Sequence, residues 1–380
     1  MKRFLLLVLG STLLLASCSN QKQEEVIQQP EEETETEVSI IPNQSLSGDQ
    51  YKMVLPYKPS AARGAIKNQI TNRLDINEME EGLRRHSTEH FSPDKYVYEE
   101  GQYLTEDYIF SLVESLNPDV DELKPSDAKD KKKKKKKEKE FRENPRVFSH
   151  VLEQNYLKKN DDDSVDLVGV SIGIALKSQY NFQVEENGDD YFEDIPKKEV
   201  MEEGQRVAEE VLEEVRRIDE LKNVPIMIGL FQEEEQSSPV PGDFIAKTLV
   251  KKDENKISDW ENLKEENVLF PSDEAEEKHN DDFQKVSTFG EKVATYFPNY
   301  VGVAGTGFYV DENLQKLSLE LPIEFFGQAE VIGFTQYVYG QVKEIFPNDY
   351  DIEVTISSSD GEESLIFRKA GEEDPTVHIY

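Results

Sequence analysis

The segment His86-Ser-Thr-Glu89-His90 has the residue types and spacing of the H-x-x-E-H motif, which serves one class of zinc hydrolases. Histidines four residues apart lie on one face of a helix, where both imidazoles bind zinc while the glutamate acts as a base. The context is poor, because Ser87, Thr88 and the nearby Ser92-Pro93 weaken a helix. No clear third-ligand helix follows. We therefore expect a solvated pair of histidines, with neither a catalytic residue nor a metal site.

Two further patterns fit structural roles better than chemical ones. The run Gly302-Val-Ala-Gly305-Thr-Gly307 loosely suggests a phosphate loop, but a dinucleotide-binding loop opens a helix, and here a strand follows. We expect these glycines to permit close packing of strands. The acids Asp281-Asp282 and the run at residues 161–163 do not follow the calcium loop of EF-hands, so we expect exposed turns. The sequence predicts no cofactor.

The only cysteine, Cys18, ends a segment with the order of a secretory signal. Lys2-Arg3 precedes a run at residues 4–15 that is apolar apart from Gly10, Ser11 and Thr12, and small residues follow it. This run is shorter than the ~20 residues of a membrane span. The tetrad Leu15-Ala16-Ser17-Cys18 resembles the bacterial lipoprotein box. That resemblance implies that signal peptidase II cuts between Ser17 and Cys18, and that Cys18 carries diacylglycerol and anchors the chain on the extracellular face of the cell membrane. The alternative is an incidental cysteine beside an ordinary signal.

Composition narrows the remaining possibilities. The 380 residues include 79 Asp and Glu against 44 Lys and Arg, a formal net charge of −35. This charge repels phosphates, so nucleic acid is not an expected partner. One cysteine cannot form an intramolecular disulfide, so the core must be hydrophobic. Residues 19–37 hold seven glutamates and few large apolar groups, which predicts a flexible tether over residues 18–49.

From Tyr51 onward, apolar periodicity predicts helices and strands in a chain of the α+β class, with mainly antiparallel sheets and packed helices. Weak similarity around Pro196 and Pro322 suggests a duplicated strand–helix–strand–strand unit. We expect a leader at residues 1–17, the tether at 18–49, an N-terminal α/β region at 50–160, and repeat units at 161–255 and 256–380. Helices are predicted at residues 75–85, 106–116, 199–221, 283–297 and 329–346. Strands are predicted at residues 51–57, 166–176, 224–231, 244–250, 300–310 and 317–325, with a hairpin at Asp360-Gly361.

Seven consecutive lysines, from Lys131 to Lys137, interrupt the acidic chain. Blocks of like charge are usually unstructured, so we expect a solvated loop over residues 127–140 or an extended helix end. The alternative is a surface for teichoic acids or lipid headgroups, because each Lys near an anionic surface contributes ~1 kcal/mol.

The layout of the whole chain resembles the CamS family of Gram-positive lipoproteins, known as sex pheromone precursors. The resemblance rests on a set of short segments and covers most of the mature chain. They are the Met1-Lys-Arg opening, the lipoprotein box, the strand at Tyr51, Ser60-Ala-Ala-Arg63-Gly64, Asn72-Arg73-Leu74-Asp75, Asp94-Lys95-Tyr96, Glu100-Gly101-Gln102-Tyr103-Leu104 and the stretch 302–321. The Glu100 to Leu104 segment is the most distinctive. The lysine block has no counterpart in this pattern.

The resemblance implies that the activity lies in the discarded leader. After signal peptidase II has cut, an intramembrane protease trims the remnant to a short apolar peptide, which is secreted, meets a pheromone receptor and induces conjugative plasmid transfer. In this sequence the corresponding peptide is Ser11, Thr12, Leu13, Leu14, Leu15, Ala16 and Ser17.

The task of the mature part is a separate question, and we do not expect an enzyme. The alternative function is an extracytoplasmic binding module for cell-wall polymer or peptide. Such a module would use exposed aromatics such as Tyr296, Tyr300 and Tyr309, or the lysine block.

Overall fold

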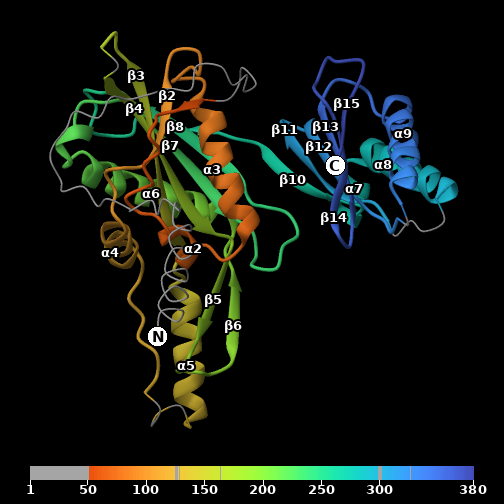
Figure 1. Cartoon of the computed structure of the whole chain (residues 1–380). Helices are drawn as coiled ribbons and strands as arrows, with labels where there is room; N and C mark the ends of the chain where they lie inside the picture. The colour runs from red at the N-terminus through yellow and green to blue at the C-terminus, as the bar shows by residue number, and fades with distance from the viewer. Residues whose placement is uncertain (1–50, 125–126, 128, 163, 298–301, 326) are drawn as a thin grey trace, which may run out of the picture. The chain divides into compact units, whose positions relative to one another are not determined.

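The computed structural model describes residues 51–124, 127, 129–162, 164–297, 302–325 and 327–380. The predicted leader, the predicted tether, and with them residues 11–17 and Cys18, lie outside the described residues. The α+β class is confirmed, since helices pack on two large sheets in which most neighbouring strands are antiparallel (Figure 1). In the described part, none of the helices has both the length and the apolar character to span a bilayer.

The first sheet has seven strands in the order β1-β2-β3-β4-β7-β8-β9. Two neighbouring pairs are parallel, β1 with β2 and β4 with β7, and the other pairs are antiparallel. The strands are β1 (Lys52–Met53), β2 (Val97–Glu100), β3 (Phe148–Lys159), β4 (Val165–Lys177), β7 (Ile226–Glu233), β8 (Asp243–Val250) and β9 (Glu261–Asn262).

Helices cover both faces of this sheet, because successive side chains of a strand point to opposite sides. Ile172 and Ile174 of β4 pack with α4 and α6, whereas Ala175 packs with α3. The helices are α2 (Ala65–Gln69), α3 (Arg73–Ser87), α4 (Glu106–Leu116) and α6 (Lys197–Val215), the last followed by the 3-10 turn η1 (Asp219–Leu221). The three predicted helices of this region are thus confirmed, although the one predicted to reach residue 221 leaves the α conformation after Val215.

The second sheet has six strands in sequence order, β10 (Glu265–Phe270), β11 (Ala304–Val310), β12 (Asn313–Pro322), β13 (Asp351–Ser358), β14 (Gly361–Arg368) and β15 (Thr376–Ile379). Its helices are α7 (Asp273–Lys278), α8 (Asn280–Tyr296) and α9 (Gln328–Ile345). Alternate residues of β12 and β13, such as Leu319 and Val354, join Phe289 and Phe334 of α8 and α9 in one core. The residues between them are half-buried or exposed.

The two sheets repeat one topology. The series β2-β3-β4-β7-β8-β9 and the series β10 to β15 both pair antiparallel, antiparallel, parallel, antiparallel and antiparallel. Each parallel pair is joined by a crossover that contains a helix, α6 or α9, as parallel neighbours require. The predicted duplication is confirmed and is larger than predicted.

Residues 50–160 and 161–255 are predicted as separate regions, but β3 pairs with β4 along nearly its whole length and joins them in one sheet. The two prolines are also not equivalent. Pro196 directly precedes α6, whereas Pro322 ends β12, well before α9.

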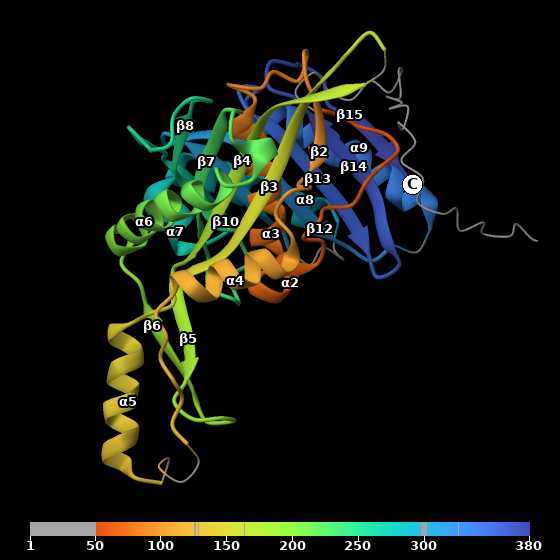
Figure 2. The same cartoon turned by 90° about the vertical axis from the view of Figure 1, so that its left-hand side faces the viewer.

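The lysine block is a helix, so of the two forms predicted for residues 127–140, a solvated loop or an extended helix end, the loop is wrong. Helix α5 (Lys131–Glu143) lies beside the hairpin of β5 (Gln179–Gln183) and β6 (Asp190–Asp194), beyond the end of the first sheet (Figures 1 and 2). The side chain of Asp130 caps the helix by accepting from the Lys132 N–H, and Phe141 stacks on Phe182 with ring centroids 5.1 Å apart. This cap, this ring contact and ion pairs such as that of Lys134 with Glu185 stabilise the helix against repulsion between its lysines.

Candidate functional site

The H-x-x-E-H segment does not have the helical geometry of the zinc motif. Helix α3 ends at Ser87, so His90 lies in the turn beyond it and the two imidazoles do not share a helical face. His86 is buried and pairs with Glu265 at 3.1 Å, while Glu89 pairs with Lys247. The expectation of a solvated pair is therefore wrong for His86. Over the described residues, the structure contains no cluster of three or more His, Cys, Asp or Glu side chains that could hold a metal ion.

Where the chain is described, the glycine and acidic patterns have structural roles, although Asp281-Asp282 lies in the first turn of α8 and not in the exposed turn expected from the sequence. Gly305 lies in β11, where a Cβ atom would come within 2.1 Å of the Ser318 carbonyl oxygen, so close strand packing requires the glycine. Asp282 accepts a hydrogen bond from the hydroxyl of Tyr309 at 3.0 Å and pairs with Lys285 at 2.8 Å. Tyr309 is only 1% exposed, so it is not the exposed binding aromatic expected from the sequence. Tyr296 is exposed and stacks on Tyr337, and Tyr300 lies outside the described residues.

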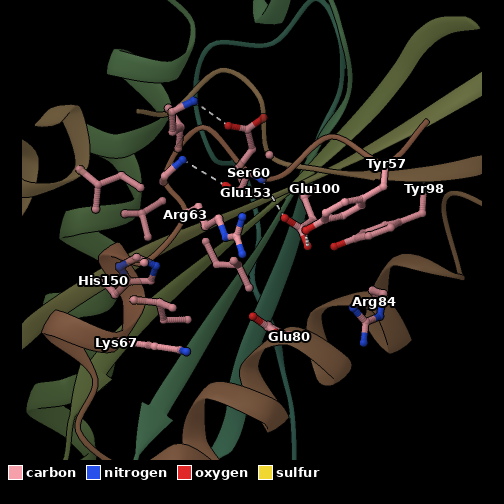
Figure 3. Close-up of a pocket in the computed structure, with 18 of the residues that line it drawn as sticks. Tyr57, Ser60, Arg63, Lys67, Glu80, Arg84, Tyr98, Glu100, His150 and Glu153 are labelled. Atoms are coloured by element: carbon pink, nitrogen blue, oxygen red, sulfur yellow. Dashed lines mark hydrogen bonds between the residues drawn. The ribbon is translucent and has the colours of Figure 1, made fainter. Parts of the chain in front are cut away.

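A cavity of about 340 Å³ lies among α2, α3, α4, β2 and β3. Figure 3 shows charged and aromatic side chains gathered around it. Two segments that carry the family resemblance, Ser60 to Gly64 and Glu100 to Leu104, supply part of its lining. Sequence reasoning identified these segments but not the cavity, because its far wall comes from β3, which the periodicity did not reveal.

The wall on the β3 side is built on a buried carboxylate. Glu153 is only 5% exposed and accepts hydrogen bonds from the backbone N–H groups of Gln102 at 2.9 Å and Leu104 at 2.7 Å. The Tyr103 N–H also contacts this carboxylate. Burial raises the pKa of Glu153, and these hydrogen bonds oppose that rise. A Cβ atom on residue 101 would lie 2.7 Å from the Glu153 Cβ, so the turn requires Gly101.

Glu100 joins the segment at residues 100–104 to the segment at residues 60–64. The Glu100 carboxylate accepts from the Tyr57 hydroxyl at 3.0 Å and from the Ser60 N–H at 2.8 Å (Figure 3). The Ala61 N–H donates to the Gly101 carbonyl oxygen at 2.9 Å. Both glutamates are thus used to hold loops, and the loops position α2 over the sheet.

The basic side chains of the cavity are Arg63, Lys67 and Arg84. The Arg84 guanidinium lies over the ring of Tyr98, 5.6 Å from its centroid. Arg63 and Lys67 are exposed and form no ion pair within the described residues, and Figure 3 shows both extending into the space that the Glu80 carboxylate also faces. Burial is the main cause that raises the pKa of Glu80. His150, hydrogen-bonded through Nδ1 to Gln69, is neutral, since burial lowers its pKa to about 3.

A second candidate surface is one side of α5. Several of its lysines form ion pairs, among them Lys134 with Glu185 at 2.8 Å and Lys137 with Glu140 at 3.0 Å. The remaining ones are exposed and form no ion pair inside the described ranges. They are Lys131, Lys132, Lys135 and Lys136, which we term the lysine face. Their spacing of three and four residues places them side by side on the helix.

Comparison with known proteins identifies the family of this chain. The sequence pattern of the family described as CamS sex pheromone cAM373 precursor matches residues 57–374. The chain belongs to the CamS family. This result confirms the resemblance noted from the sequence and shows a role as a sex pheromone precursor.

Solved structures agree with this assignment. The crystal structure of a sex pheromone precursor from Lactobacillus salivarius subsp. salivarius UCC118 is 28% identical, with a TM-score of 0.79, and the match covers 90% of this chain and 99% of that one. The C-terminal domain of the sex pheromone staph-cAM373 precursor from Staphylococcus aureus is also 28% identical, with a TM-score of 0.67 over 82% of this chain and 98% of that chain. None of the curated proteins compared with it matches the chain.

Proposed function

We propose that this CamS-family chain is a lipoprotein of the cell membrane whose cleaved leader supplies a secreted pheromone. Signal peptidase II cuts between Ser17 and Cys18, and Cys18 carries the diacylglycerol anchor. An intramembrane protease then releases the peptide from Ser11 to Ser17, which induces conjugative plasmid transfer. The family match carries this proposal, together with the order of charged, apolar and small residues before the only cysteine.

The chemistry of the peptide suits this role. It has no charged side chain, and Leu13, Leu14 and Leu15 would each contribute about 1.5–3 kcal/mol on burial in an apolar groove of a receptor. Because the message lies in the leader, the folded body needs no catalytic group, and we infer that it is not an enzyme.

Mass spectrometry of spent culture medium tests the processing. We expect the fragment of residues 11–17 in medium from cells that express the chain, and its loss when Cys18→Ala blocks lipidation and cleavage. Absence of the fragment from wild-type medium contradicts the proposal. A synthetic peptide of the same sequence should induce mating in responsive donor cells, whereas a peptide with its leucines in scrambled positions should not.

A second candidate function concerns the body, which we propose binds anionic cell-wall polymer outside the cell through the lysine face. The supporting observation is that four neighbouring lysines are exposed and unpaired in the described chain, while other lysines of α5 form ion pairs. Each contributes ~1 kcal/mol near an anionic surface, an attraction that salt screens.

Binding to purified teichoic acid tests this candidate. Replacing Lys131, Lys132, Lys135 and Lys136 by Gln should abolish binding that high salt also abolishes. The control replaces Lys197, Lys198, Lys251 and Lys252, which are exposed elsewhere and change the net charge equally. Equal loss in both variants would show that net charge, and not the lysine face, governs binding. Binding to anionic lipid vesicles but not to the polymer would reassign the surface.

A further inference from the structure

The cavity beneath α2 has an apolar part and a charged part. Ile66, Leu104, Ile109, Val151 and Leu152 supply aliphatic lining, whereas Arg63, Lys67 and Glu80 supply charge. Its volume of about 340 Å³ is near the lower end of the ~300–1,000 Å³ of small-molecule sites. It suits a small molecule or the end of a chain, and it is too small for a folded partner.

Two cations, Arg63 and Lys67, and one acid, Glu80, remain available to a ligand. Glu153 is occupied by the backbone N–H groups of the turn at residues 102–104, and Glu100 by Tyr57 and Ser60. These acids are therefore engaged in structure. In the described chain, by contrast, neither Arg63 nor Lys67 has an acidic partner. An anionic group would gain charge-assisted hydrogen bonds from both, and the guanidinium can bind a carboxylate through two parallel bonds.

The remaining acid of the lining, Glu80, favours a ligand whose anionic group carries a single negative charge. The Glu80 carboxylate faces the same space as Arg63 and Lys67 (Figure 3), and its negative charge repels any anion bound there. A singly charged carboxylate meets less of this repulsion than a doubly charged phosphate. Because the apolar lining is continuous with the cationic end, the rest of the ligand should be aliphatic.

We propose that this cavity is a binding site for an aliphatic carboxylate, with Arg63 and Lys67 holding the carboxylate and the lining of α2, α4 and β3 enclosing the aliphatic part. A free fatty acid and the C-terminal end of a short apolar peptide both present this chemistry. The proposal is independent of pheromone processing, since it uses only the folded body.

Isothermal titration of the full chain tests the proposal, with Cys18→Ser to keep lipid off the protein. The probes are decanoate, decanol, butyrate, decyl phosphate and trileucine. We expect decanoate to bind more tightly than the uncharged decanol, the short butyrate and the doubly charged decyl phosphate. Trileucine distinguishes the sources, because binding tighter than that of decanoate assigns the site to peptide ends and weaker binding assigns it to fatty acids.

Variants separate the two parts of the site. Arg63→Gln and Lys67→Gln should each weaken decanoate binding by about tenfold or more, since each removes a charge-assisted hydrogen bond. Lys58→Gln, exposed and outside the lining, is the matched control and should change nothing. Ala62→Phe should fill the apolar part and abolish binding, with circular dichroism confirming the fold. Equal binding of decanol and decanoate, unchanged binding in both charge variants, or no binding to folded wild-type chain overturns the proposal.

Discussion

The first and second sheets share one six-strand topology but differ in what has been added to it. Around the first sheet, α3 covers the face that α4 and α6 leave open, and β1, α2, α5 and the β5–β6 hairpin supplement the repeat. In the second sheet, alternate strand residues face one helical layer and the others stay half-buried or exposed. The lysine face belongs to the additions, and the cavity lies where the added helices α2 and α3 meet α4, β2 and β3 of the repeat. The repeat thus supplies the scaffold, and the added segments complete the cavity and carry the lysine face.

The largest expected effect concerns the additional helix α3. Leu83 is fully buried there against the first sheet, so Leu83→Ala should lower the free energy of unfolding by about 2–5 kcal/mol. Val377 of β15 is 38% exposed, and Val377→Ala should cost less than about 1 kcal/mol. Urea denaturation of both variants measures the difference. Similar costs would mean that α3 is not part of the cooperative core.

The next effect concerns the buried glutamate that holds the cavity wall. Glu153→Gln replaces an anionic acceptor of several N–H groups by an amide, which should cost about 1.5–3 kcal/mol. Glu122→Gln, at an exposed position, is the control and should have almost no effect. Thermal denaturation followed by circular dichroism compares them. An unaffected Glu153→Gln would show that the turn at residues 102–104 is held by other contacts.

A smaller effect depends on pH and arises from two buried acids, Glu233 of β7 and Asp75 of α3. Burial raises the pKa of Glu233 to about 7, against opposing contacts with Ser149 and Lys177, and burial likewise raises that of Asp75 to about 7. Between about pH 4 and pH 7 the folded state holds protons that the unfolded state has lost. The stabilisation is complete below the unfolded-state pKa and disappears as pH rises through the folded-state value.

Melting temperature should therefore fall as pH rises from 5 to about 7.5, with about 1–3 kcal/mol lost. Glu233→Gln, which cannot ionise, should flatten part of this slope. A wild-type profile that rises over this range would contradict the assignment.

The smallest effect separates paired from unpaired lysines of α5. Lys134→Gln removes the pair with Glu185 and should cost about 0.2–1 kcal/mol, whereas Lys135→Gln should change stability by less than about 0.5 kcal/mol. Chemical denaturation at low and high salt measures both. A larger loss for Lys135→Gln would mean that the lysine face contributes to the fold.

The sequence predicted best where one apolar stripe decides the structure. Helices α3, α4, α8 and α9 show their buried faces in their own periodicity. Strand β3 was missed because it buries polar residues, among them His150 and Glu153. Their partners, Gln69 and the turn at residues 102–104, lie far away in the chain. The local sequence pattern cannot show hydrogen bonds between residues so far apart in the chain.

The same limit explains the cavity and α5. The lysine block forms a helix and not a loop because Phe141 stacks on Phe182 and Lys134 forms an ion pair with Glu185. These contacts join segments about forty to fifty residues apart, which local periodicity does not show. The cavity could not be predicted from the sequence, because one of its walls is β3, which packs behind the turn that follows β2. The family segments around Ser60 and Glu100 were visible in the sequence, but their meeting through the Glu100 carboxylate was not.

The two parallel pairs also predict an order of folding. The crossover between β12 and β13 spans residues 323–350 and holds one helix, whereas that between β4 and β7 spans residues 178–225 and includes the β5–β6 hairpin and α6. Closing the longer connection costs about 0.5 kcal/mol more chain entropy, and longer connections slow folding. The half synthesised last should therefore form its parallel pair first. Pulse-labelling hydrogen exchange would detect this as earlier protection of β13 than of β7.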